Sequence, residues 1–299
     1  MLSTALSRGA IVASAALVLA GCRSADRPGA AAAQSAVPGA GAAAGAAAGA
    51  GAAPTVVTVT ARDFAFDAPK EVPAGLTTFR LVNDGPSLHH IQLIKLSEGK
   101  TAADFIAALK AGGPPPKWAA FAGGPNPPDA GGTASATVPL EPGNYVMICF
   151  VPAADGMPHV MKGMIRPLTV TAASGPAKVP PAADLTMKLV DYDFQLSAPL
   201  TAGKHVIKVE NAGPQPHEVA IVRLKPGKTP EDFVHWGEKP VGPAPGDLYG
   251  GVSVIMPGAD AYAEVDLPAG DYALLCFMGD AKDGKPHFAH GMMKRIEVK

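Results

Sequence analysis

The chain has 299 residues, a formal net charge of −1 at pH 7 and hydrophobic side chains at 47% of its positions. A charge so close to neutral gives no reason to expect a nucleic-acid partner, because phosphate backbones are bound by strongly basic surfaces. About 245 residues follow position 54, and typical domains of about 100–150 residues predict two domains in that length.

The first 22 residues have the features of an export signal. Arg8 precedes an apolar run from Ala10 to Ala20, which is too short to cross a bilayer as a helix of the mature protein. The run ends in Leu19-Ala20-Gly21-Cys22, and this order resembles the lipobox of bacterial lipoproteins. The resemblance implies removal of the signal peptide, residues 1–21, lipid attachment at Cys22 and a place in the cell envelope. Because Arg23 follows the cysteine, it implies the outer membrane, facing the periplasm, if the cell is Gram-negative.

Residues 22–54 are expected to form a flexible tether. Alanine, glycine and proline dominate this segment, and no charged residue occurs between Arg27 and Pro54. Such a composition buries too little apolar surface to offset the entropy of ordering the chain. A second segment rich in proline and alanine, residues 172–183, is predicted to link two domains at residues 55–171 and 184–299.

Both predicted domains show the patterns of β-strands together with one short helix. Alternating or continuous apolar, β-branched and aromatic residues predict strands at 55–60, 77–82, 91–96, 145–150, 205–209, 219–224 and 272–277. Thr101 with Asp104, and Thr229 with Asp232, fit helix N-terminal caps, so helices are expected at about residues 102–111 and 230–236. These elements predict an all-β chain of small antiparallel β-sandwiches, each with a short helical insertion.

The two domains repeat one pattern of residues. Residues 82–94 read VNDGPSLHHIQLI, and residues 210–222 read ENAGPQPHEVAIV. Residues 143–164 and 270–292 share Gly-x-Tyr-x-x-x-Cys, followed by Pro-His and Gly-Met. Each domain therefore carries two histidines, one cysteine and one methionine in the same order, namely His89, Cys149, His159 and Met164, and His217, Cys276, His287 and Met292. Two imidazoles, a thiolate and a thioether are the ligand set of a blue-copper electron-transfer centre.

The residues that carry this pattern resemble the cupredoxins, the family of plastocyanin, azurin and the nitrite-reductase domains. The likeness rests on Asn-x-Gly-x-x-x-His at residues 83–89 and 211–217 and on the Cys, His and Met pattern that follows. It covers nearly all of the chain after residue 55. It implies two tandem cupredoxin-like antiparallel β-sandwiches that hold up to two type 1 copper ions through the eight residues named above. It also implies that the solvent-side histidine of each site is the electron port.

Some details of the sites remain open at this point. The first ligand could be His89 or His90, and Glu218 at the second of these positions in the other domain favours His89. Phe150, Phe277 and Phe288 are expected to keep water away from the metal. A Cys149–Cys276 disulfide is an alternative in an oxidising compartment, and it would require the two Cα atoms to lie within about 7 Å of each other.

The sequence predicts an envelope-anchored copper-binding protein that transfers single electrons, with envelope redox proteins or copper-handling proteins as partners. A copper-delivery protein without redox turnover is an alternative, which the soft thioethers of Met157 and Met161 would suit. A metal-free cupredoxin-like module that binds a partner is another. No His-x-His pair occurs, and Ile148 and Leu275 precede the cysteines. No residue is therefore assigned a catalytic role, and the sequence predicts that the protein is not an enzyme.

Overall fold

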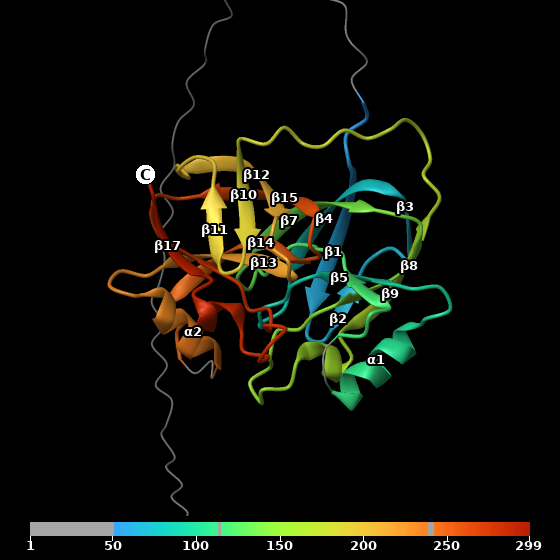
Figure 1. Cartoon of the computed structure of the whole chain (residues 1–299), viewed down its shortest axis with the longest axis horizontal. Coiled ribbons are helices and arrows are strands. Elements are labelled where there is room, and N and C mark those ends of the chain that lie inside the picture. The colour runs from blue at the N-terminus through green and yellow to red at the C-terminus, as the bar shows by residue number, and fades with distance from the viewer. Residues whose placement is uncertain (1–50, 113–114, 239–241) are drawn as a thin grey trace, which may run out of the picture. The chain divides into compact units, whose positions relative to one another are not determined.

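The computed structural model describes residues 51–112, 115–238 and 242–299 (Figure 1). The predicted signal peptide, the lipidation residue Cys22 and positions 22–50 of the predicted tether lie outside the described residues. The described residues all belong to one compact unit, Ala48–Lys299. Within them, no helix is long and apolar enough to cross a lipid bilayer.

Strands make up most of both halves of this unit. The first half contains β1 (Thr55–Arg62), β2 (Ala65–Asp67), β3 (Glu71–Pro73), β4 (Gly75–Asn83), β5 (Gln92–Leu96), α1 (Ala102–Ala111), β6 (Ala119–Phe121), β7 (Thr133–Leu140), β8 (Gly143–Ile148) and β9 (Ile165–Thr171). The second half contains β10 (Leu185–Val190), β11 (Asp193–Leu196), β12 (Gly203–Asn211), β13 (His217–Leu224), α2 (Pro230–Glu238), β14 (Gly246–Ile255), β15 (Asp260–Leu267), β16 (Gly270–Leu275) and β17 (Met293–Val298). One 3-10 turn precedes the last strand of each half, at His159–Lys162 and His287–His290.

Three sheets form two sandwiches. An eight-stranded sheet, in the order β11-β10-β12-β15-β7-β4-β1-β2, runs through both halves. A five-stranded sheet, β3-β9-β8-β5-β6, belongs to the first half, and a four-stranded sheet, β14-β13-β16-β17, belongs to the second. The predicted fold class, all-β with two tandem sandwiches and a short helix in each, is confirmed. Most neighbouring strands are antiparallel, but β1 with β4, β10 with β12 and β3 with β9 are parallel, which apolar alternation along single strands does not reveal.

The two halves are joined through equivalent residues. Strands β7 and β15 pair across the junction, with Ala136 opposite Ala263, and an isolated bridge sets Pro125 opposite Val252. In each pair the two residues are 127 positions apart, the same offset as between Cys149 and Cys276. A pairing of equivalent positions is what a local two-fold axis produces.

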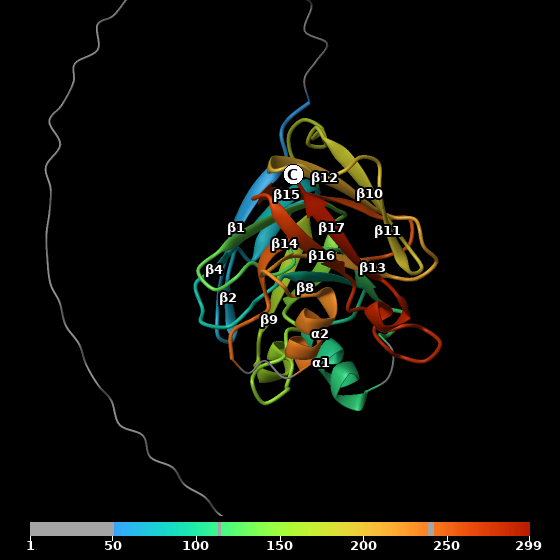
Figure 2. The same ribbon diagram turned by 90° about the vertical axis from the view of Figure 1, so that its left-hand side faces the viewer.

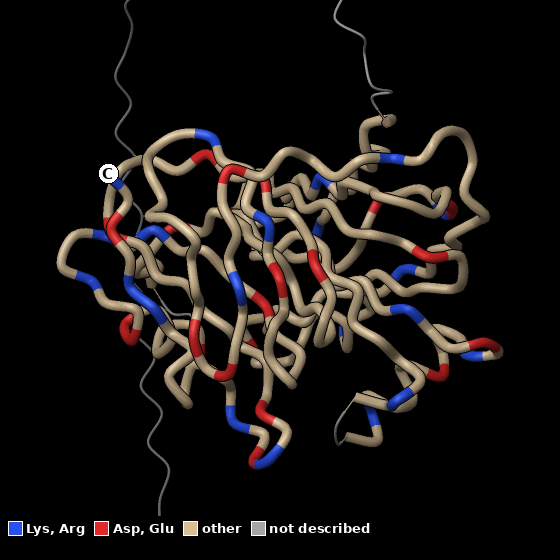
Figure 3. The backbone as a smooth tube through the Cα atoms, turned by 45° about the horizontal axis from the view of Figure 1, so that its top comes forward, with Lys and Arg blue, Asp and Glu red and all other residues tan. Residues whose placement is uncertain are grey.

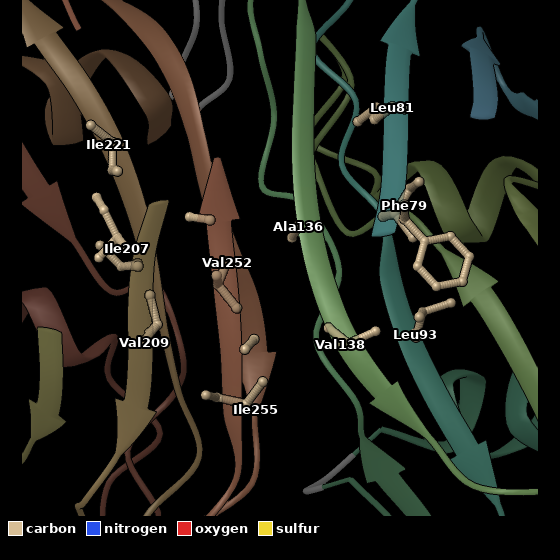
Figure 4. Packing of buried hydrophobic residues seen from close by; sticks show 14 of the residues in the cluster. Phe79, Leu81, Leu93, Ala136, Val138, Ile207, Val209, Ile221, Val252 and Ile255 are labelled. Carbon is tan, nitrogen blue, oxygen red and sulfur yellow. The ribbon is translucent and has the colours of Figure 1, made fainter. Parts of the chain in front are cut away.

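A single apolar core extends across this junction. It includes Phe79, Leu81, Ala136 and Val138 from the first half and Ile207, Val209, Ile221 and Val252 from the second (Figure 4). The halves therefore share this part of their interior.

On the backbone trace, Lys and Arg residues are interspersed with Asp and Glu residues, so neither sign of charge dominates (Figure 3).

The helices begin where the capping pattern predicts. Thr101 and Asp104 form a capping box at the start of α1. In α2, the Asp232 N–H donates to Thr229 Oγ1 at 3.2 Å, and the Thr229 N–H donates to Asp232 Oδ2 at 2.9 Å. Both helices lie at the same end of the sheets (Figures 1 and 2). At residues 51–54 the predicted tether differs from a free spacer, because Ala52 pairs with Lys178 in the linker.

Candidate metal centres

The structure brings three of the four predicted ligands of the first half together. Donor atoms of His89, Cys149 and His159 all lie within 4.8 Å of one another, and each residue is fully buried. His89 Nδ1 lies 3.1 Å from His159 Nδ1, and Cys149 Sγ lies 3.6 Å from the same atom. The ring of His90 instead contacts Asn126 Oδ1 and the N–H of Phe150, so its neighbour His89 takes the ligand position. We call this group the first site.

The second site repeats the arrangement with His217, Cys276 and His287, all of them fully buried. His217 Nδ1 lies 3.0 Å from His287 Nδ1. Cys276 Sγ lies 3.9 Å from His217 Nδ1 and 3.5 Å from His287 Nδ1. Both cysteines are free, so no disulfide joins them.

The backbone fixes these residues from the ends of two strands. Each cysteine directly follows an inner strand of its sheet, β8 or β16, and each second histidine begins a 3-10 turn. The Cys149 N–H donates to the carbonyl of Met164 at 3.3 Å, and the Met164 N–H donates to the carbonyl of His159 at 3.0 Å. The same two bonds join Cys276, Met292 and His287, at 3.2 and 2.9 Å. Met164 and Met292 are fully buried, so each predicted axial residue is held in the interior beside its cysteine and histidine.

The Asn-x-Gly motif shapes the loop before the first histidine. Asn83 Oδ1 accepts from the N–H of Gly85 at 3.2 Å, and Asn83 Nδ2 donates to the carbonyl of Ser87 at 2.9 Å. A Cβ atom at Gly85 would lie only 2.8 Å from His89 Nε2. Glycine is therefore required at this position by the close approach of the imidazole.

A carboxylate orients the first histidine of each site, and sequence reasoning missed it. His89 Nε2 lies 2.7 Å from Asp63 Oδ1, and His217 Nε2 lies 2.6 Å from Asp191 Oδ1. When Nε2–H donates to the carboxylate, the lone pair of Nδ1 is left free for a metal, which is a common second-shell arrangement in metal sites. The available signal was an acidic and an aromatic residue repeated 128 positions apart, Asp63-Phe64 and Asp191-Tyr192.

The expectation of a solvent-side histidine is wrong. All four site histidines are fully buried. The ring of Phe64 packs edge-on against His159 at 4.8 Å, and the ring of Tyr192 packs against His287 at 5.4 Å. Phe277, which was expected to exclude water, is itself 40% exposed. The rings that cover His159 and His287 are therefore those of Phe64 and Tyr192.

Burial sets the protonation of the ligands. It raises the pKa of the Cys149 thiol to about 12, and backbone N–H groups of His90 and Val151 that hydrogen-bond to the sulfur oppose this rise. It also lowers the pKa of His159 to about 4. The histidines are therefore neutral and able to bind a cation near pH 7. A metal ion would favour the thiolate, as coordinated thiols are deprotonated.

The donor set fits one soft metal ion in each site. Nitrogen and sulfur donors that lie about 2.0–2.3 Å from one ion and spread around it are separated by roughly 3–4 Å, and the measured separations are 3.0–3.9 Å. Among the described residues, buried His159 Nε2 and His287 Nε2 have no hydrogen-bond partner, whereas Nδ1 of each ring faces the other donor atoms of its site. Two imidazoles, a thiolate and a thioether favour copper over hard cations such as magnesium or calcium.

Comparison with known proteins gives similar structures but no sequence family. No known family of protein sequences matches the chain, and no curated protein matches it. An auracyanin from Roseiflexus castenholzii is 28% identical over 40% of this chain and 99% of its own, with a TM-score of 0.27. Auracyanin A from Chloroflexus aurantiacus, a "blue" copper protein, is 25% identical over 40% of this chain and 99% of its own, with a TM-score of 0.28.

A third similar structure corrects one prediction. The copper-containing nitrite reductase of Thermus scotoductus is 15% identical over 83% of this chain and 62% of its own, with a TM-score of 0.25. The prediction that the protein is not an enzyme is contradicted, because the structures similar to this chain include an enzyme. At this identity the likeness concerns the fold and not the reaction.

Proposed function

We propose that the protein binds one copper ion at each His–Cys–His site and transfers single electrons through these sites in the cell envelope. When bound, copper supplies a centre that alternates between two oxidation states one electron apart. The observation that supports the proposal most directly is the convergence of His89, Cys149 and His159 in one buried group, repeated by His217, Cys276 and His287. Met164 and Met292 would complete the two ligand sets.

The surrounding residues would keep the sites rigid and dry. Hydrogen bonds between backbone groups, and those that the histidines donate to Asp63 and Asp191, position the ligands before a metal binds. Preorganised ligands need little rearrangement when the charge of the site changes by one unit, which favours rapid electron exchange. Phe64 and Tyr192 would exclude water from the second histidine of each site.

The alternatives fit the geometry less well. Copper delivery calls for open sites from which the metal exchanges readily, whereas the histidines and cysteines of both sites are fully buried. Of the methionines that would suit delivery, Met157 is 47% exposed and belongs to neither site. In a metal-free module one of the two facing Nδ1 atoms would donate to the other at 3.0–3.1 Å, whereas a shared cation would be bound by the lone pairs of both.

Localisation and partners are part of the same proposal. Lipid attachment at Cys22 would hold the folded unit on the membrane, facing the periplasm in a Gram-negative cell. Electrons would be exchanged there with other redox proteins of the envelope. This part rests on the residue order around Cys22, outside the described residues.

Visible absorption after addition of Cu(II) tests the proposed function. The full chain would carry Cys22→Ser, so that only the two site thiols remain. An intense thiolate-to-copper band is expected, with Cys149→Ser and Cys276→Ser each removing about half of it. A protein that binds only Cu(I) without colour, or no copper at all, would contradict electron transfer through blue-copper sites.

A further inference from the structure

The two sites share their ligands but differ in the charges beside them. The residue after the first histidine is His90 in the first half and Glu218 in the second, and both are buried with 7% exposure. The residue four positions after the cysteine is Ala153 in the first half and Asp280 in the second, and the side chain of Asp280 is 1% exposed. The second site therefore has two buried carboxylates beside it where the first site has none.

Glu218 and His90 make equivalent contacts but differ in charge. The backbone N–H of each hydrogen-bonds to the sulfur of the cysteine in its own site. Glu218 Oε1 accepts from the N–H of Phe277 at 3.1 Å, whereas His90 Nε2 accepts from the N–H of Phe150 at 2.8 Å. An imidazole nitrogen that accepts a hydrogen bond carries no proton, so the ring of His90 is neutral. The Glu218 carboxylate, after burial, adds to the rise in the pKa of the Cys276 thiol.

Asp280 brings a second negative charge close to the second site. Its Oδ2 lies 3.9 Å from His287 Nε2 and accepts from Tyr192 Oη at 2.5 Å and from Gln215 Nε2 at 2.9 Å. These donors hold the pKa of the carboxyl well below its usual range. Beside the first site, Lys162 Nζ lies 5.4 Å from the ring of Phe64, which covers His159, and pairs with the exposed carboxylate of Asp155 at 2.6 Å.

We propose that Glu218 and Asp280 make the second site the harder of the two to reduce, so that an electron taken up by the protein settles at the first site. This inference rests on the proposed function. Buried negative charges act through a medium of low dielectric constant and favour the more positive, oxidised state of a nearby centre. The carboxylates that both sites share, Asp63 and Asp191, cancel in the comparison.

A buried polar bridge connects the unequal sites. His90 Nδ1 lies 3.4 Å from Asn126 Oδ1, and Asn126 Nδ2 donates to Glu218 Oε2 at 3.1 Å. Together with the bonds to Phe150 and Phe277, this chain of contacts runs from the residue after one site cysteine to the residue after the other. When one electron passes from the second site to the first, the second site is oxidised and the first is reduced. No bond is made or broken, and no proton moves.

Redox titration of single-site variants tests the inference. The titration is made at pH 8, where Glu218 is ionised although burial raises its pKa to about 7. In the copper-loaded full chain, Cys149→Ser leaves the second site to be measured, and Cys276→Ser leaves the first. The second site is expected to have the lower reduction potential. Glu218→Gln and Asp280→Asn, each made in the Cys149→Ser chain, should raise that potential. His90→Gln in the Cys276→Ser chain replaces one neutral side chain by another and should leave the first potential nearly unchanged.

A binding measurement gives a second readout. Competition with chelators should show that Glu218→Gln strengthens Cu(I) binding at the second site relative to Cu(II) binding. Equal potentials in the two single-site proteins, or a second site with the higher potential, would overturn the inference while the blue band upholds the proposed function. Because this comparison needs no change at Glu218, it stands even if that variant fails to fold. Absence of the blue band from every protein would overturn the proposed function, and the inference with it.

Discussion

Ala136 pairs with Ala263 across the junction of the two halves, and each occupies the position of the other in the repeated sequence. Neighbouring pairs follow the same rule, since Ser135 faces Glu264 and Thr137 faces Tyr262. The junction thus resembles the self-complementary interface of a two-fold dimer within a single chain. The two copies differ at some equivalent positions near this junction, such as His90 and Glu218. These differences make the two metal sites unequal in an otherwise symmetric arrangement.

Replacing Asn126 by alanine should weaken the junction. Asn126 Nδ2 donates to Glu218 Oε2 and to the carbonyls of Val219 and Val252, at 3.1, 2.9 and 3.1 Å. The loss leaves these buried acceptors of the second half without their donor, at a cost of about 1–3 kcal/mol. Urea unfolding of the metal-free protein would measure this loss of stability. Asn144→Ala, on an exposed position of β8, is the control and should change stability by no more than about 0.5 kcal/mol. Equal midpoints for the two variants would contradict the role of Asn126.

The sequence predicted both helices of this fold but only some of its strands. The capping pairs set the start of both helices, and the strands at residues 55–60 and 77–82 lie inside β1 and β4. It missed β2, β3, β6 and β11, because strands of three or four residues are too short to show a period. It also assigned no strand to the longer β7, β9, β10, β14, β15 and β17. It also missed the sheet shared by both halves, because the pairing of β7 with β15 depends on contacts between distant segments that local patterns do not encode.

The candidate sites show the same division. The repeated order of histidine, cysteine, histidine and methionine was sufficient to find the residues that the fold brings together. Asp63 and Phe64 were missed because they lie on a short connection between strands, far in the sequence from the ligands, with Asp63 26 residues before His89. A single acidic residue on a loop is usually solvated, and only its recurrence as Asp191 distinguishes it. The parallel pairing of β1 with β4 brings the residues that follow each strand together, and so places Asp63 beside His89.

Removing the Asp63 carboxylate should weaken copper binding at the first site. Asp63→Ala leaves His89 Nε2 without its acceptor, so the ring loses its fixed tautomer and orientation. Changes to such supporting residues typically cost about 10–100-fold in metal affinity. Competition with a Cu(II) chelator in the Cys276→Ser chain would measure this loss of affinity. Ser87→Ala is the matched control, because it removes only the bond from Ser87 Oγ to Asp63 Oδ2 at 2.7 Å. A loss of affinity as large in the control would refute a specific contribution from the His89 contact.

Shortening Phe64 should open the first site to solvent. The ring lies 4.8 Å from that of His159, and its removal by Phe64→Ala exposes a fully buried ligand. Electron exchange with a small soluble oxidant should become severalfold faster, because the oxidant can approach more closely. Stopped-flow mixing in the Cys276→Ser chain would follow it. Phe64→Tyr in the same chain keeps a covering ring, as Tyr192 does at the second site, and should leave the exchange rate nearly unchanged. An unchanged rate in Phe64→Ala would mean that electrons leave the first site by another face.

The stability of the metal-free protein should rise with pH between about 4 and 6.5. Burial lowers the pKa of His90 and of His159 to about 4, whereas the unfolded chain titrates near 6.5. In this window the unfolded state therefore binds more protons than the folded state, so acidification favours unfolding. For His90 alone the shift corresponds to about 3 kcal/mol. Glu218 acts in the opposite sense, because burial raises its pKa to about 7, and the stability this contributes is lost as pH rises from about 4.5 to 7.

Substitutions at these two residues separate their contributions. Urea unfolding of the metal-free protein at several pH values should show a shallower rise for His90→Gln and a steeper rise for Glu218→Gln. The histidines of both sites prevail over the single glutamate, because burial also lowers the pKa values of His89, His217 and His287. A pH dependence that His90→Gln leaves unchanged would mean that this imidazole gains a proton as easily in the folded protein as in the unfolded chain. That result would contradict its burial as a neutral ring between Phe150 and Asn126.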